Sequence, residues 1–87
     1  MLFEDSKSFR KALKRLPANV QNDAFEAINN VADADTFTDI PHLKSLTNYP
    51  NYYRIRVRSY RIGMFWTGDR FLIQTIGPRG DFYKHFP

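Results

Sequence analysis

Cysteine is absent from the sequence, so disulfide bonds, thiolate metal sites and a cysteine nucleophile are all excluded. Two histidines are present, His42 and His85, and their separation gives no zinc-binding motif. No apolar run approaches the roughly 18 residues of a membrane span. The opening MLFEDSKSF has an acidic pair where a signal peptide has basic residues. We therefore expect a cytoplasmic protein that holds no metal or cofactor and does not enter a membrane.

The composition is that of one small folded domain, which we place at residues 1–87. Apolar residues make up 43% of the chain and aromatic residues 16%, so the core is small and depends on large rings. Charged residues make up 25%, an ordinary share for a globular domain, which argues against disorder.

Positive charge is concentrated in the second half of the chain. Residues 1–43 contain five Lys or Arg and seven Asp or Glu, a net charge of −2, whereas residues 44–87 contain eight and two, a net charge of +6. Such a distribution suits a polyanionic partner. It equally suits a small basic protein whose charge serves solubility, and at this point both interpretations stay open.

Helical spacing is evident in the first third of the chain. Residues 1–4 are apolar enough for a short strand, and Asp5 and Ser6 can cap a helix after them. Two apolar stripes follow, separated by Pro17, which disfavours helix in the residue before it. The first stripe consists of Phe9, Ala12, Leu13 and Leu16, and the second of Val20, Ala24, Ala27, Ile28 and Val31. The two stripes predict a helical hairpin joined by a tight turn.

Alternation with a period of two begins after a polar connection at residues 33–51, which contains a short ordered stretch around 42–46. It predicts strands at 52–57, 60–67 and 71–76, with turns at 58–59 and 67–70 and a short tail at 81–87. The order is β-α-α-β-β-β. This is an α+β fold with a small, mainly antiparallel sheet, in which the helical hairpin packs on one face and leaves the other open.

Four arginines lie within eight positions of the segment YYRIRVRSYRIGMFW: Arg54, Arg56, Arg58 and Arg61. Strand alternation places Arg54 and Arg56 on one face, and the hairpin turn brings Arg61 alongside them. Arg58, nearer the turn, is expected at the rim, and Arg79 and Tyr83 follow the last strand. We therefore expect four guanidinium groups and a phenol to converge on the exposed face.

No acidic residue lies between Tyr52 and Trp66, although opposite charges across strands would stabilise a sheet that merely faced water. Guanidinium stays charged and binds two phosphate oxygens at once, so this pattern favours an anion-binding face. Exposed rings among the arginines could stack on unpaired bases, which favours RNA or single-stranded nucleic acid. The candidate rings are Tyr52, Phe65 and Tyr83.

The segments YYRIRVRSYRI, FLIQTI and PRGDFYKHF, with the opening strand and a Phe-x-x-x-Leu-x-x-Leu helix, resemble the RelE/ParE superfamily of toxins from bacterial type II toxin–antitoxin systems. The resemblance implies a RelE-like microbial RNase-type fold. For the RelE-like branch, which the motifs favour, it implies a ribosome-dependent endoribonuclease that cuts mRNA in the ribosomal A site. The 2′-hydroxyl would attack the adjacent phosphate without a metal, and the partners would be the ribosome, mRNA and a cognate antitoxin.

The resemblance also implies roles for individual residues. Arg54, Arg56, Arg61 and Arg79 would orient the phosphate and stabilise the charge that develops in the transition state. Tyr83 would stack on or orient the RNA and share in proton transfer. The further substrate contacts expected are Tyr52, Arg58, Phe65, Lys84 and His85.

The sequence departs from the family pattern in ways that bear on the chemistry. In RelE itself the paired positions are lysines, which can lose a proton, whereas arginine cannot. Pro78 stands where a histidine often precedes the matching arginine, and Arg58-Ser59 replaces the usual Gly-Asp turn. No general base is evident unless Tyr83 or His85 serves.

Two other functions stay open. A ParE-like inhibitor of DNA gyrase shares this fold and hairpin, although its helices are usually longer than the pair expected here. A catalytically inactive module of the same fold would use the basic face to bind its partner alone. In each case the expected partner is an acidic, partly disordered antitoxin segment that folds onto the sheet face or a helix groove.

Overall fold

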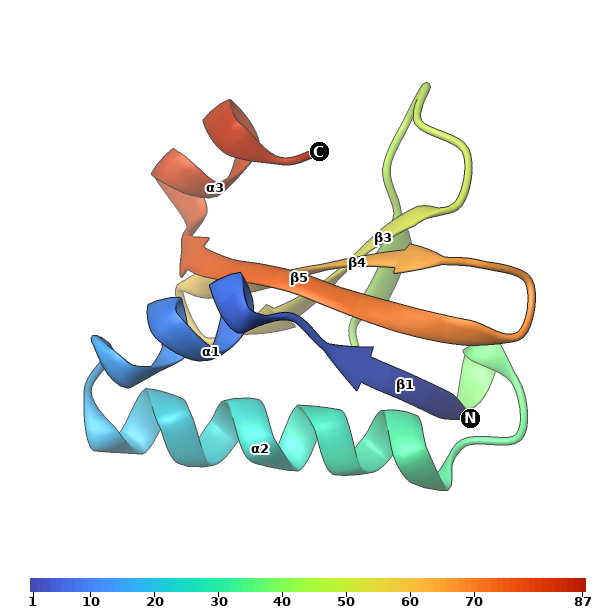
Figure 1. Ribbon diagram of the computed structural model, residues 1–87, viewed down its shortest axis with the longest axis horizontal. Coiled ribbons are helices and arrows are strands. Elements are labelled where there is room, and N and C mark those ends of the chain that lie inside the picture. The colour runs from blue at the N-terminus through green and yellow to red at the C-terminus, as the bar shows by residue number, and fades with distance from the viewer.

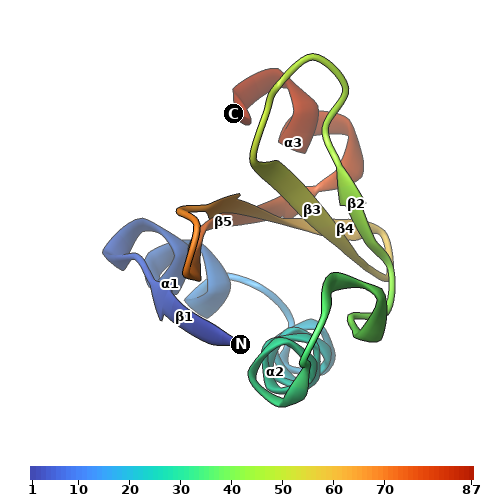
Figure 2. The ribbon, with the colours of Figure 1, turned by 90° about the vertical axis from the view of Figure 1, so that its right-hand side faces the viewer.

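The chain folds into a five-stranded sheet with two helices on one face and a third helix on the other (Figure 1, Figure 2). The computed structural model describes all residues, 1–87. The elements are β1 (Leu2–Asp5), α1 (Lys7–Lys14), α2 (Ala18–Asp33), a 3₁₀ turn η1 (Phe37–Asp39), β2 (Leu43–Ser45), β3 (Tyr52–Val57), β4 (Tyr60–Trp66), β5 (Arg70–Pro78) and α3 (Arg79–His85).

The sheet has the strand order β1-β5-β4-β3-β2. β1 pairs with β5 in parallel, and the other three pairings are antiparallel. The predicted α+β class with a small, mainly antiparallel sheet is therefore confirmed. No helix is both long enough and apolar enough to span a membrane.

The helical hairpin forms as the two apolar stripes predict. Ser6 caps α1, since its hydroxyl accepts a hydrogen bond from the backbone N–H of Phe9 at 3.0 Å and donates to the carbonyl of Gln74 at 3.0 Å. α1 packs on β5, while α2 packs on β3 and β1. The core between helices and sheet consists of Phe9, Leu13, Ala24, Val31, Ala34, Ile40, Ile55, Val57, Ile62, Met64, Phe71, Ile73 and Ile76.

The third helix corrects the expectation of a short C-terminal tail and an open second face. Residues 79–85 form α3, which lies on the face of the sheet opposite α1 and α2 (Figure 2). Phe82 belongs to α3 and Phe86 follows its last residue, and their rings pack together with centroids 5.0 Å apart. Their side chains are 3% and 6% exposed, and this burial is the physical reason that the segment becomes helical and docks.

Glycine at position 63 makes the docking of α3 possible. Gly63 of β4 lies directly opposite Arg54 of β3. On the α3 side of the sheet, the ring of Phe86 packs against Gly63. A Cβ atom added at Gly63 would lie 2.7 Å from the nearest ring carbon, which real contacts do not reach. Because Gly63 has no side chain, Phe86 and the end of the chain can pack closely on β4.

Candidate nucleic-acid interface

The α3 side of the sheet has four cationic side chains in two cross-strand pairs. Lys44 of β2 lies directly opposite Arg54 of β3, and Arg56 of β3 lies directly opposite Arg61 of β4. Directly paired residues share a face, so these four side chains belong to the side away from the helical hairpin. We call Lys44, Arg54, Arg56 and Arg61 the basic face.

None of these four cations forms an ion pair. Ion pairs occur elsewhere and neutralise other basic residues: Arg10 with Asp5, Arg58 with Asp23, Arg70 with Glu4 and Asp69, and Lys84 with Asp81. Like charges directly opposite each other destabilise strand pairing. A sheet that keeps two such pairs without a carboxylate partner is therefore suited to an external anion.

Arg61 is the exception to the expected exposure. Its side chain is only 8% exposed, which corrects the prediction that four guanidinium groups converge on an open surface. Its Nη1 donates to the backbone carbonyls of Tyr60 at 2.9 Å and Arg58 at 3.2 Å, and its buried Nε has no hydrogen-bond partner. An unpaired buried guanidinium N–H is costly, so the burial of Arg61 is not fully compensated by its own hydrogen bonds.

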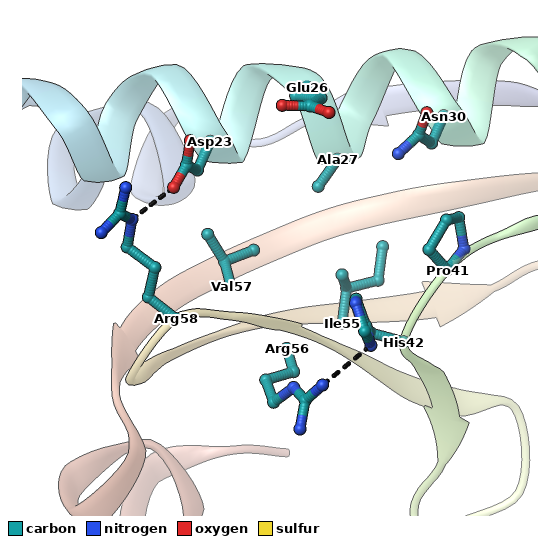
Figure 3. Close-up of a pocket in the computed structure, with 10 residues that line it drawn as sticks. All are labelled: Asp23, Glu26, Ala27, Asn30, Pro41, His42, Ile55, Arg56, Val57 and Arg58. Atoms are coloured by element: carbon teal, nitrogen blue, oxygen red, sulfur yellow. Dashed lines mark hydrogen bonds and ion pairs between the residues drawn. The ribbon is translucent and has the colours of Figure 1, made fainter.

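Arg54 and Arg56 are held at one edge of the basic face by His42. The Nη1 atom of Arg54 donates to the main-chain carbonyl of His42 at 3.0 Å. The Nη2 atom of Arg56 lies 3.1 Å from Nδ1 of the His42 ring (Figure 3). Both guanidinium groups retain further N–H donors, because each has five and these contacts use one apiece.

Arg58 is directed away from the other arginines. It forms an ion pair with Asp23 of α2, at the far end of a pocket between α2 and β3 (Figure 3). The pocket has a volume of about 590 Å³ and also receives Arg56 and His42. Arg58 is thus at the rim of the sheet, as the sequence suggested, but its charge is partly neutralised there.

Tyr83 and Arg54 line one pocket. This pocket, of about 330 Å³, lies between the β2–β3 connection and α3 and is lined by Lys44, Ser45, Leu46, Thr47, Tyr49, Arg54, Tyr83 and Phe86. Tyr83 and Tyr49 are 49% and 51% exposed. Two accessible phenol rings beside two cations give a setting in which a base could stack while its phosphate is bound.

The remaining predicted contacts lie in different places. Tyr52 and Phe65 are half-buried and pack on each other with ring centroids 4.9 Å apart, and Tyr52 also contacts Phe86 at 5.6 Å. His85 lines a separate small pocket with Gly77 and Asp81. Arg79 is exposed at the start of α3, where its N–H donates to Ser59 of the β3–β4 turn at 2.9 Å.

The sequence did not predict three side chains that belong to the basic face or lie near it: His42, Lys44 and Tyr49. Lys44 belongs to a strand of three residues, too short for alternation to be recognised. Tyr49 is in the connection that follows it. The available signal was the apolar Leu43 followed by the basic Lys44, which matches the first step of a strand alternation.

Two carboxylates outside the basic face have a lowered pKa. The backbone N–H of Thr36, with that of Asp35, donates to Asp39 and lowers the pKa of its carboxyl. Hydrogen bonds from Arg70 and Thr67 lower the pKa of Asp69 in the β4–β5 turn. No group of three His, Asp or Glu residues is close enough together to hold a metal ion.

Known proteins resemble the chain over nearly its whole length. It is 32% identical over 83 residues to toxin RelE3 of Methanocaldococcus jannaschii, covering 94% of both chains. A RelB–RelE antitoxin–toxin complex from Methanococcus jannaschii contains a chain with 31% identity, a TM-score of 0.80 and full coverage of both chains. A RelE–RelB complex from Pyrococcus horikoshii OT3, with 22% identity and a TM-score of 0.70 over 90% of this chain and 93% of that one, shares the fold. No protein-family profile matches the sequence.

Proposed function

The chain belongs to the RelE family of toxins from toxin–antitoxin systems, and we propose that it is a ribosome-dependent endoribonuclease that cleaves mRNA. The observation that supports this activity best is the basic face, with two directly opposed cation pairs and no carboxylate partner. Such a surface binds a phosphodiester through several charge-assisted hydrogen bonds. It would also stabilise the extra negative charge that develops when a nucleophile attacks phosphorus.

The proposed reaction is attack of the ribose 2′-hydroxyl on the adjacent phosphate. The 2′-oxygen forms a bond to phosphorus while the bond to the 5′-oxygen breaks, leaving a 2′,3′-cyclic phosphate and a 5′-hydroxyl. The 2′-hydroxyl loses its proton, and the departing 5′-oxygen gains one. No metal ion is required for this balance.

We assign the phosphate to Arg54 and Arg56, whose guanidinium groups each keep free donors. Arg61 contributes its positive charge from its buried position beside Arg56, and Arg79 contributes from the start of α3. Tyr83 stacks on or orients the RNA beside Arg54 and shares in proton transfer. Arginine cannot accept a proton at working pH, so the arginines bind and stabilise charge only.

The test is a cleavage assay with purified ribosomes programmed with a short mRNA. We expect the wild-type protein to cut the mRNA and the double variant Arg54→Ala/Arg56→Ala to be slower by about 100-fold or more. Arg10→Ala is the matched control, since Arg10 is an exposed arginine of α1 that pairs with Asp5 away from the basic face. Intact mRNA at a large excess of wild-type protein over ribosomes would contradict the proposal. The same preparation tested for inhibition of DNA supercoiling by gyrase would then identify a ParE-like activity.

A cognate antitoxin is the second part of the proposal. The structural neighbours are toxins in complex with RelB antitoxins, and the basic face of this chain needs an anionic partner. We assign that role to an acidic antitoxin segment that orders on the sheet and occupies the phosphate positions. Toxin activity and antitoxin binding would then exclude each other, because both use the same cations.

A further inference from the structure

We propose that His42 is a positioning residue, whose main-chain carbonyl and imidazole ring together hold the guanidinium groups of Arg54 and Arg56 in the orientation that receives a phosphate. The inference rests on the proposed function, since it concerns the same basic face. It adds a residue that neither the sequence pattern nor the family resemblance indicates.

The geometry has two independent contacts from one residue. The carbonyl oxygen of His42 accepts from Nη1 of Arg54 at 3.0 Å, and Nδ1 of its ring accepts from Nη2 of Arg56 at 3.1 Å. The same carbonyl also receives the backbone N–H of Arg56 at 3.4 Å, which ties His42 to the strand itself. Long arginine side chains lose considerable rotamer freedom when they are ordered, so orienting both from one anchor reduces that cost at the moment of binding.

The backbone of His42 is adapted to this task at some cost. Its φ angle is +63°, in the left-handed region where residues other than glycine are uncommon. Asparagine and histidine tolerate this region better than most residues, but strain there is usually retained only where the conformation is needed. His42 lies between the exposed Pro41 and the start of β2. β2 is the strand that places Lys44 opposite Arg54.

The ring contact fixes the protonation state that His42 must have. Arginine is only a donor, so Nδ1 must be an acceptor and the ring proton must be on Nε2. A doubly protonated ring would place a second N–H against the guanidinium of Arg56 and add a like charge, and the contact would be lost. The charged side chains that line the pockets on either side of His42 are Asp23, Glu26, Lys44, Arg54, Arg56 and Arg58.

A pair of substitutions separates the ring contact from the backbone requirement. His42→Gly accepts the left-handed conformation but removes the acceptor. His42→Asn also tolerates that conformation and offers an amide oxygen close to the position of Nδ1. Both variants should fold, so a difference between them reports on the acceptor and not on the turn.

The direct measurement is ¹⁵N NMR of the free protein, in a His85→Asn background that leaves one imidazole. We expect Nδ1 of His42 to accept a hydrogen bond and the guanidinium of Arg56 to show hindered rotation. The hindrance should disappear in His42→Gly and persist in His42→Asn. Freely rotating Arg56 in the wild-type protein, or identical Arg56 spectra in the two variants, would overturn the proposal.

The functional measurement is single-turnover cleavage on programmed ribosomes. His42→Gly should be slower by about tenfold at neutral pH, with His42→Asn restoring most of the rate. Equal rates of wild type and His42→Gly would contradict positioning. Absence of cleavage by the wild-type protein would contradict the proposed nuclease instead, while the NMR result would still decide the contact.

Discussion

At the scale of the residue, Arg58 adopts a conformation that other residues would adopt more easily. It is the first residue of the two-residue turn between β3 and β4, and its φ angle is +56°. The left-handed region costs about 1–2 kcal/mol for a residue with a Cβ atom, and glycine avoids that cost. The family pattern has glycine at this turn. Arg58 therefore replaces a favourable residue with a strained one that reaches Asp23.

This strain predicts a stability difference between two substitutions that both remove the ion pair. Arg58→Gly and Arg58→Ala each lose the contact with Asp23, which is solvent-exposed and worth less than about 1 kcal/mol. Arg58→Gly should nevertheless exceed Arg58→Ala in free energy of unfolding by about 1 kcal/mol, since only alanine retains the left-handed penalty. Urea denaturation of the two variants measures the difference. If Arg58→Ala were the more stable, the turn would not be strained.

The sequence predicted which face of the sheet each arginine belongs to, but not how deeply its side chain is buried. Alternation correctly placed Arg54, Arg56 and Arg61 on one side of the sheet. It could not reveal that Arg61 folds back onto the carbonyls of its own turn, because that depends on rotamers and on what covers the strand. The contact between His42 and Arg56 was equally hidden, since it joins residues fourteen positions apart through a ring nitrogen.

At the scale of the element, α3 is attached to the sheet by a few aromatic contacts. Phe86 contacts Phe82 with ring centroids 5.0 Å apart and Tyr52 at 5.6 Å, and it rests on Gly63. α3 also places Tyr83 beside Arg54. The position of Tyr83 on the basic face therefore depends on the contact between Phe86 and Gly63.

Gly63→Ala should detach the end of α3 from the sheet. The added Cβ atom would overlap the ring of Phe86, and overpacking of this kind costs about 1–3 kcal/mol. We expect the cost to vanish when Phe86→Ala is already present, because the truncated side chain leaves room. Urea denaturation of the two single variants and the double variant forms a thermodynamic cycle. Additive losses would show that Phe86 and Gly63 do not interact.

Elements with a clear period were predictable, and short ones were not. The capped α1, the Pro17 break, α2 and the three long strands follow from spacing and turn residues. β2 has three residues, which is less than two periods of alternation. Gly80 and the preceding Gly77-Pro78 predict an irregular tail where α3 forms, although Phe82 and Phe86 have the i, i+4 spacing that favours a helix.

At the scale of the whole molecule, charge is divided into three blocks along the chain. Residues 7–15 contain five basic residues and no acidic one, residues 18–43 contain five acidic and no Lys or Arg, and residues 44–66 contain five basic and no acidic one. The fold places the acidic α2 and the basic face on opposite sides of the sheet (Figure 2). The sheet therefore separates the cations of the basic face from the carboxylates of α2.

This division predicts where an acidic antitoxin binds. Arg54→Glu/Arg56→Glu should weaken binding of the cognate antitoxin by about 100-fold or more, and the affinity of the wild-type pair should fall with added salt. Lys7→Glu/Lys11→Glu is the control, because it makes the same change in net charge on exposed residues of α1. Isothermal titration at two salt concentrations measures both. An equal loss in the two variants would place the contact outside the basic face.

The parallel pairing of β1 with β5 also constrains the order in which the elements can form during synthesis. Residues 2–5 are synthesised before every other strand, but their hydrogen-bonding neighbours are residues 70–73. α1, which follows β1, packs mainly on that same late strand. A chain still being made can therefore form α2 and the β3–β4 hairpin, but its first strand must wait for its last one. The molecule reaches its complete form only when nearly all of it has left the ribosome.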